Sequence, residues 1–309
     1  MKVLVLGGYG AVGRHVVTEL RRGGVTAIAA GRDRVRADAV VGLGDPMLTG
    51  YRAALSGVDV VVNASGAENP ELAAVAGAGG CAFVDITATK SYVDALRRLP
   101  AAAPILVDVG LAPGLTNLLA VAVYHEEPGP IDLAVLLGAG ERHGAAATDW
   151  SYRLLGGHFH EDGERIRNYS RPARFLLPGH PTRRLLFRLD FSDQHTLRRE
   201  LDIPVRTYFG LDSRAATAAL AASTWLPGAS KAPRRLHLPG TDQWTALARG
   251  HNGATRWARG RNQSRTTALV AVAATERARA ATPGVHALHN VLGLADLSTD
   301  EIEIGPTTA

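Results

Sequence analysis

The sequence predicts an α/β fold in which a Rossmann-type, doubly wound parallel sheet carries an inserted α+β domain with an antiparallel sheet. Three observations predict it. Short runs of Val, Ile and Leu alternate with helical patterns over the first 120 residues. A G-x-G-x-x-G motif follows the first of these runs directly. After residue 130, polar residues interrupt the apolar runs, and a strong hairpin signal follows.

Six strand-like runs are predicted in the first domain. Continuous apolar runs that alternate with helices are typical of a parallel sheet covered on both faces. The runs are Lys2–Leu6, Val25–Ala30, Ala39–Val41, Val58–Ala64, Ala82–Ile86 and Ile105–Val109. An amphipathic helix is predicted between the first two runs, ending at Gly23-Gly24. Its apolar face consists of Val12, Val16, Val17 and Leu20.

A cluster of Pro, Gly and charged residues at 125–130 predicts a domain boundary. We expect a Rossmann domain over 1–124, an inserted substrate and dimerisation domain over 125–263, and a helix and tail over 264–309 that return to the first domain. Asn252-Gly253 predicts a hairpin between two of the inserted strands, because both residues tolerate positive φ. The elements expected after the boundary are strands Ile131–Leu137, Leu185–Phe191, Val205–Phe209, Trp244–His251 and Ala254–Arg261, and helices Arg214–Trp225 and Ser264–Ala281.

Composition excludes several classes of protein. The chain has 309 residues, 46% hydrophobic and 20% charged, which is the balance of a protein that buries a core and not of a disordered one. Cys81 is the only cysteine, so a disulfide framework is excluded. No apolar run is long enough to span a membrane, and no export signal precedes the first strand. We therefore expect a cytoplasmic protein with no membrane partner. A net charge of +5 alone does not indicate a nucleic-acid partner, and we expect none.

The glycine motif predicts a dinucleotide site. It is placed as that chemistry requires, directly after a strand and at the start of a helix. The first glycine permits the tight turn, the second lets a pyrophosphate approach the backbone, and the third lets helix and strand pack closely. The helix N-terminus then offers free N–H groups to the phosphates. The residues of the predicted loop are Gly8, Tyr9, Gly10, Ala11, Val12 and Gly13.

The residues after the second strand favour NADP over NAD. About 20 residues beyond the glycine motif, NAD-binding units usually present an acidic residue to the ribose 2′-hydroxyl. This chain has Arg32 there, which suits a 2′-phosphate because a guanidinium pairs with it through two parallel hydrogen bonds. Asp33 is the alternative ligand for the ribose, although its position one residue further out favours capping the following turn.

Two later strand ends are expected to face the cofactor, since ligands of such sheets bind beyond the carboxyl ends of the strands. The small residues Ala64, Ser65 and Gly66 end the fourth strand and let the backbone approach a nicotinamide ribose. Asp85 and Thr87 end the fifth. For Asp85, a cofactor contact and a buried structural role are both open.

Four segments of the first 122 residues, taken in order and spacing, resemble the saccharopine dehydrogenase family: MKVLVLGGYGAVGR, VDVVVNASG, AFVDITATKSYVDAL and VGLAPGLTNLLA. The resemblance returns weakly at 260–281 and is thin between. It implies an NADP-dependent oxidoreductase that transfers hydride between NADP(H) and the C–N bond of an imine or secondary amine. Ala112 and Thr116-Asn117 depart from saccharopine-forming members, which carry an acidic residue and an Asp-His pair there. This argues against saccharopine itself as the substrate.

Three residues are candidates for catalysis. Lys90 and Tyr92 follow the fifth strand and are expected near the cleft of such a fold, while Asn117 begins the helix after the sixth strand and suits a substrate or nicotinamide amide. A surface pair between Lys90 and Asp94, four residues apart on a helix, explains Lys90 equally well. The substrate is expected to be amino-acid- or polyamine-like, with amine and carboxylate groups.

Two other functions remain open. A short-chain-dehydrogenase-like carbonyl reductase would share the glycine loop, but no Tyr-x-x-x-Lys motif occurs where it is expected, since Tyr92 is followed by Val93-Asp94-Ala95-Leu96. An NADP-binding redox sensor would also share the loop and would never oxidise its ligand. His158 and His160 alternate on one predicted strand, but no third ligand has suitable spacing, so we expect no metal. We expect a homodimer, as for most soluble enzymes of this size.

Overall fold

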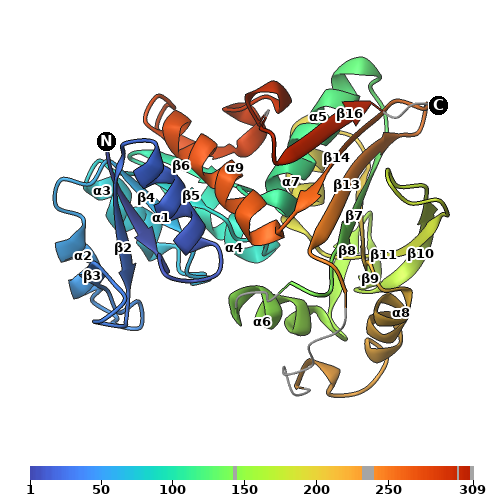
Figure 1. The fold of residues 1–309 in the computed structure, drawn as a ribbon, viewed down its shortest axis with the longest axis horizontal. Coiled ribbons are helices and arrows are strands. Elements are labelled where there is room, and N and C mark those ends of the chain that lie inside the picture. The colour runs from blue at the N-terminus through green and yellow to red at the C-terminus, as the bar shows by residue number, and fades with distance from the viewer. Residues whose placement is uncertain (142–144, 232–239, 298, 307–309) are drawn as a thin grey trace. The chain divides into compact units, whose positions relative to one another are not determined.

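The computed structural model describes residues 1–141, 145–231, 240–297 and 299–306 (Figure 1). The chain forms two compact units. Unit 1 contains Met1–Leu115 and Ser264–Leu297, and unit 2 contains Thr116–Gln263 and Ser298–Ala309. Among the described residues, no helix is long and apolar enough to cross a membrane.

The sheet of unit 1 is parallel throughout and has the strand order β15-β6-β5-β4-β1-β2-β3. Its strands are β1 (Lys2–Leu6), β2 (Thr26–Gly31), β3 (Ala39–Val40), β4 (Val60–Asn63), β5 (Ala82–Asp85), β6 (Pro104–Val107) and β15 (Gly284–Ala287). The strand order reverses between β1 and β4, which defines a doubly wound sheet and its ligand-binding switch point. The predicted fold class is confirmed.

Helices bury the apolar side chains of this sheet. They are α1 (Gly13–Arg22), α2 (Thr49–Ala54), α3 (Glu71–Ala78), α4 (Lys90–Arg97) and α9 (Gln263–Ala278). As predicted, Val16, Val17 and Leu20 form the buried face of α1. Leu4 and Phe83 are fully buried within the sheet. Three irregular turns complete the unit: Leu111–Leu115, Leu288–Asn290 and Leu294–Leu297.

Unit 2 is built on a mixed sheet of order β10-β11-β12-β7-β13-β14-β16. Its strands are β7 (Ile131–Leu137), β10 (Ser170–Phe175), β11 (Arg184–Arg188), β12 (Val205–Leu211), β13 (Gln243–Gly250), β14 (Thr255–Arg261) and β16 (Ile302–Pro306). β7 and β12 are parallel, whereas the other neighbours are antiparallel. The hairpin predicted at Asn252-Gly253 joins β13 to β14. A separate two-stranded hairpin consists of β8 (His158–Glu161) and β9 (Glu164–Arg167).

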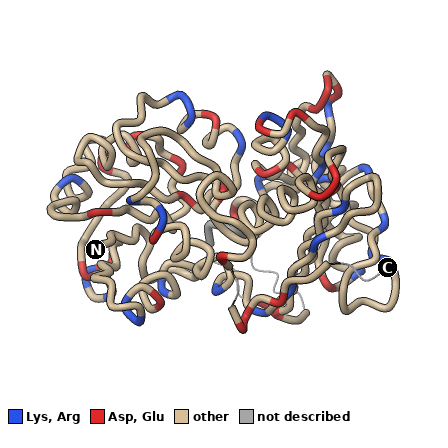
Figure 2. The backbone as a smooth tube through the Cα atoms, turned by 90° about the horizontal axis from the view of Figure 1, so that it is seen from above, with Lys and Arg blue, Asp and Glu red and all other residues tan. Residues whose placement is uncertain are grey.

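The described residues of unit 2 form four α-helices, α5 (Thr116–Glu126), α6 (Ala145–Leu154), α7 (Ser192–Leu201) and α8 (Arg214–Ser223), and a short 3-10 turn at Ala229–Lys231. α5 packs against β7, β13 and β14, and α7 packs against β12. Ser213 caps α8 by accepting a hydrogen bond from the Ala216 N–H. In each unit, basic and acidic residues are interspersed along the backbone (Figure 2).

Two segments belong to a different unit than the sequence suggests. α5 was expected at the end of the Rossmann domain, but its buried residues Leu118, Leu119 and Val123 pack on the second sheet. The helix and tail over 264–309 were expected to return to the Rossmann domain. Ser264–Leu297 does belong to unit 1, but β16 pairs with β14 from Arg256↔Pro306 to Gly260↔Ile302. The unpaired edge of β14 explains the second difference, because a strand edge has backbone groups that another strand can satisfy.

Candidate functional site

The turn from β1 to α1 is built from glycines that no other residue could replace. Gly7 has a positive φ of 70°, and its carbonyl oxygen accepts a hydrogen bond of 2.8 Å from the Gly10 N–H. A Cβ atom at Gly13 would lie 2.2 Å from the same oxygen. At Gly8, a Cβ atom would lie 2.6 Å from the Cα atom of Ala29 on β2. The loop therefore lies directly against the strands and the start of the helix.

Gly7 is the glycine that sequence reasoning missed, because the tight turn was assigned to Gly8. The positive φ belongs to Gly7, and Gly8 is required instead by its close approach to β2. The double glycine in Leu6-Gly7-Gly8 was the available signal. The first turn of α1 contains no acidic residue, and a helix N-terminus of this kind is suited to an anion.

The turn after β2 distinguishes the two residues proposed for the adenosine ribose. The Asp33 carboxylate accepts a hydrogen bond of 2.9 Å from the Val35 N–H, so it caps the turn as its position favours. Arg32 is exposed, and within the described residues its side chain has no hydrogen bond or ion pair. The carboxyl end of β2 therefore presents an uncompensated cation to solvent.

The carboxyl ends of β4 and β5 are joined by a buried hydrogen-bond network. The Asn63 amide donates to Asp85 Oδ2 at 2.7 Å, and the Thr87 N–H donates to Asp85 Oδ1 at 2.7 Å. Ser65 Oγ donates to Asn63 Oδ1 at 2.6 Å. Asp85 is 1% exposed, and this burial raises the pKa of its carboxyl group although the hydrogen bonds oppose the shift. Sequence reasoning left Asn63 out of the site, and it is the residue that links the two strand ends.

Tyr92 and Lys90 lie in different environments, although both belong to the first two turns of α4. Tyr92 is 4% exposed, and its hydroxyl group donates to Asp85 Oδ2 at 3.1 Å. Burial raises the pKa of this hydroxyl group, and the neighbouring Asp85 adds to the effect. The Lys90 side chain is 43% exposed and its ammonium group contacts Asp94 Oδ2 at 2.5 Å, which is the surface pair that the spacing allowed.

Asn117 lies in unit 2, whereas the other candidate residues all lie in unit 1. It is fully buried in the first turn of α5. Its neighbour Thr116 donates a hydrogen bond of 2.8 Å to Asp193 Oδ2, and Thr207 donates one of 2.8 Å to Asp193 Oδ1. The first turns of α5 and α7 are thus joined through one buried carboxylate.

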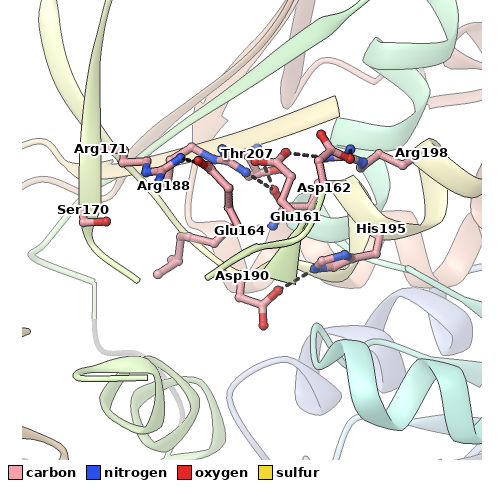
Figure 3. Close-up of polar contacts among 12 residues, drawn as sticks. Glu161, Asp162, Glu164, Ser170, Arg171, Arg188, Asp190, His195, Arg198 and Thr207 are labelled. Atoms are coloured by element: carbon pink, nitrogen blue, oxygen red, sulfur yellow. Dashed lines mark hydrogen bonds and ion pairs between the residues drawn. The ribbon is translucent and has the colours of Figure 1, made fainter. Parts of the chain in front are cut away.

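A second polar cluster lies between the β8–β9 hairpin, β11 and α7 (Figure 3). Arg188, 3% exposed, forms an ion pair of 2.8 Å with Glu161, which also pairs with Arg198. Arg198 additionally contacts Asp162 and lowers the pKa of its carboxyl group. His195 Nε2 lies 2.6 Å from Asp190 Oδ1. A cavity of about 110 Å³ is lined by Phe159, His160, Glu161, Asp162, Gln194, His195 and Arg198.

A larger cavity of about 330 Å³ lies near the carboxyl ends of β7 and β12. It is lined by residues that include His180, Asp212, Ser213, Thr241 and Trp244. The Asp212 carboxylate accepts hydrogen bonds from the backbone of Ala139, Ser213 and Thr241. Burial opposes the charge of Asp212, yet these hydrogen bonds together lower the pKa of its carboxyl group.

The two units and the glycine loop define a class, the two-domain α/β fold of dehydrogenases. No family model and no curated protein matches the sequence. Among solved structures, the chain is similar to apo saccharopine dehydrogenase (L-Glu forming) from Saccharomyces cerevisiae, with a TM-score of 0.65 and 13% identity over 99% of this chain and 100% of that one. At this identity the likeness shows a shared fold, and it confirms the expected resemblance at that level.

Two further structures are similar to a lesser degree. A meso-dapdh mutant with DAP from Clostridium tetani has a TM-score of 0.49 and 12% identity, covering 96% of each chain. An amine dehydrogenase from Mycobacterium smegmatis has a TM-score of 0.46 and 13% identity, covering 95% of this chain and 96% of that one.

Proposed function

We propose that the chain is an NADP(H)-dependent oxidoreductase that transfers hydride between the cofactor and the C–N bond of an imine or secondary amine. The observation that carries the proposal is the β1–α1 cradle. At Gly7, Gly8 and Gly13, a Cβ atom would lie 2.7 Å or less from a backbone atom, so a side chain at any of these positions would displace the backbone. Such a turn, followed by a helix N-terminus free of acidic residues, fits a pyrophosphate.

The residues present fit NADP(H) at each part of the site. The loop from Gly8 to Gly13 would hold the pyrophosphate through N–H groups other than those of Gly8 and Gly10, which donate to the carbonyl oxygens of Ala30 and Gly7. Arg32 would pair with the 2′-phosphate, since it is exposed and no described carboxylate neutralises it. Asp33 is already engaged by the turn, which favours Arg32 over Asp33 as the residue that recognises this end of the cofactor. Ala64, Ser65 and Gly66 would border the nicotinamide ribose, with Asp85 and Thr87 beside them.

The hydride belongs to the cofactor, so the protein has to position groups and supply a proton. Lys90 is the candidate for proton transfer to nitrogen, because its ammonium group is partly exposed and Asp94 holds it at 2.5 Å. Tyr92 enters the proposal as a positioning residue, since its hydroxyl group is buried against Asp85. Asn117 is fully buried, and we likewise propose that it is a positioning residue, which holds the first turn of α5 in place.

The likeness to saccharopine dehydrogenase supports the choice of C–N chemistry, and the saccharopine-forming pattern absent at Ala112 and Thr116 argues for another amine and oxo acid. The test is the consumption of NADPH by the purified protein in the presence of paired amines and 2-oxo acids. Oxidation that needs both partners supports the proposal. Tight NADPH binding with no oxidation across the panel would favour a redox sensor, and oxidation with a carbonyl compound alone would favour a carbonyl reductase.

A further inference from the structure

We propose that Arg36 is a preformed platform on which the adenine ring of the dinucleotide stacks. The inference rests on the proposed function. It assigns a residue to the adenine ring, whereas Arg32 is proposed to bind only the 2′-phosphate. It depends on a set of contacts between the glycine loop and the turn after β2. Four residues make these contacts: Tyr9, Gly31, Asp33 and Arg36.

Tyr9 is fixed in place from two sides. Its ring lies over Gly31, where a Cβ atom would come within 2.3 Å of the ring, so the glycine is required for the ring to fit. Its hydroxyl group accepts a hydrogen bond of 3.1 Å from the Asp33 N–H. The tyrosine that stands between two glycines of the loop therefore reaches across to the end of β2 and holds the loop and the turn together.

Arg36 is stacked on this ring. Its guanidinium group lies 4.5 Å from the ring centroid and donates a hydrogen bond of 3.0 Å to the Tyr9 carbonyl oxygen. The residue is exposed, and within the described part of the chain its side chain has no other hydrogen bond, ion pair or ring contact. A guanidinium group is planar and stacks on aromatic faces. One face of Arg36 is thus covered by Tyr9, and the opposite face is open.

The position of this open face identifies its ligand. With the pyrophosphate on the first turn of α1, the adenosine half of a dinucleotide extends toward the turn after β2. The planar group next to the ribose there is the adenine base. A planar cation held over an aromatic ring suits a π-system, whereas the unstacked Arg32 is free to turn its N–H groups toward a phosphate. Arg36 should therefore bind the part that NADPH and NADH share.

The test is calorimetric titration of the full chain with NADPH and with NADH. Arg36→Ala is expected to weaken both by about tenfold, the scale of a lost stacking contact with a base. Tyr9→Leu removes the ring beneath the guanidinium group and should weaken both in the same way. Arg34→Ala is the matched control, because Arg34 is exposed on the same turn and has no hydrogen bond or ion pair within the described residues, so both affinities should be unchanged.

The outcomes separate this inference from the proposed function. If the unaltered chain binds neither nucleotide, the dinucleotide site and the platform are both wrong. If it binds NADPH but Arg36→Ala behaves like Arg34→Ala, the platform is wrong and the dinucleotide site stands. If Arg36→Ala weakens NADPH alone, Arg36 recognises the 2′-phosphate and not the base, which also overturns the inference.

Discussion

Gly13 begins helix α1 directly against the carbonyl oxygen of Gly7, so that a Cβ atom at residue 13 would lie 2.2 Å from that oxygen. A contact this short is backbone against backbone, and neither partner can rotate away as a side chain would. The end of β1, the loop and the helix N-terminus are therefore held as one rigid turn, and its N–H groups are arranged before any ligand arrives.

Gly13→Ala should disrupt this turn. We expect a loss of about 1–3 kcal/mol in the free energy of unfolding, the usual cost of overpacking, and a large loss of NADPH affinity. Urea denaturation and calorimetric titration measure the two effects. Gly23→Ala is the control at the other end of α1, where the nearest atom would lie 3.5 Å from the added Cβ. Equal behaviour of the two variants would contradict the account of the turn.

Tyr92→Phe should remove the hydrogen bond from the tyrosine hydroxyl group to Asp85 and keep the ring packed. The expected loss is about 1 kcal/mol in the free energy of unfolding. Because a hydrogen bond to the charged form is lost, the pKa of the Asp85 carboxyl group should rise further. Urea denaturation tests the first effect, and NMR titration of the Asp85 carboxyl carbon tests the second. An unchanged titration would show that the hydroxyl group does not act on Asp85.

The buried pair of Arg188 and Glu161 should be costly to break from either side. Glu161→Gln leaves the Arg188 cation buried without its carboxylate, for which we expect a loss of about 3–5 kcal/mol. Arg188→Met should cost less, because Glu161 keeps its contact with Arg198. Glu164→Gln is the matched control, since its pair with Arg171 is 51% and 61% exposed and should contribute less than about 1 kcal/mol. The denaturation midpoints of the three variants test this ranking. We expect the lowest midpoint for Glu161→Gln and the highest for Glu164→Gln, and the reverse order would contradict the account.

Asp212 should make the free energy of unfolding depend on pH in the acidic range. Its pKa in the folded state lies below the ordinary value of 3.8, so its contribution is complete above that pH and is lost as the pH falls through the lower folded value. The stability difference between the unaltered chain and Asp212→Asn should be largest at neutral pH and should shrink below about pH 3.8. Urea denaturation of the two proteins at neutral pH and below about pH 3.8 measures this difference. A stability difference that increases as the pH falls would contradict the proposed lowering of the Asp212 pKa.

The local signals in the sequence predicted the parallel sheet well. β1 and β7 have the predicted bounds, because each is a largely apolar run, and β7 follows directly on the breaker cluster at 125–130. β15 and β16 were not predicted. Each forms by pairing at a sheet edge with a strand far away in sequence, Gly284 with Pro104 and Ile302 with Gly260, and no local pattern encodes such a partner. Of the short β8–β9 hairpin, only the first strand, with His158 and His160, was predicted.

The candidate site likewise contains features that the sequence predicts and features that depend on contacts between distant residues. The motif identified the glycine loop and the residue type at position 32, since both depend on spacing along the chain. The Tyr9–Arg36 stack and the Asn63–Asp85 bond join residues 27 and 22 positions apart, and they arise only when the carboxyl ends of neighbouring strands meet. Burial of Tyr92 could not be read from its neighbours, because Lys90 on the same helix remains partly exposed.

The most direct test of the central claim is a paired titration of the unaltered chain and Arg32→Ala with NADPH and NADH. The account predicts that NADPH binds more tightly to the unaltered chain and that Arg32→Ala removes this preference while leaving NADH affinity in place. Failure of both nucleotides to bind would contradict the dinucleotide site. A preference for NADPH that survives in Arg32→Ala would show that another residue recognises the 2′-phosphate.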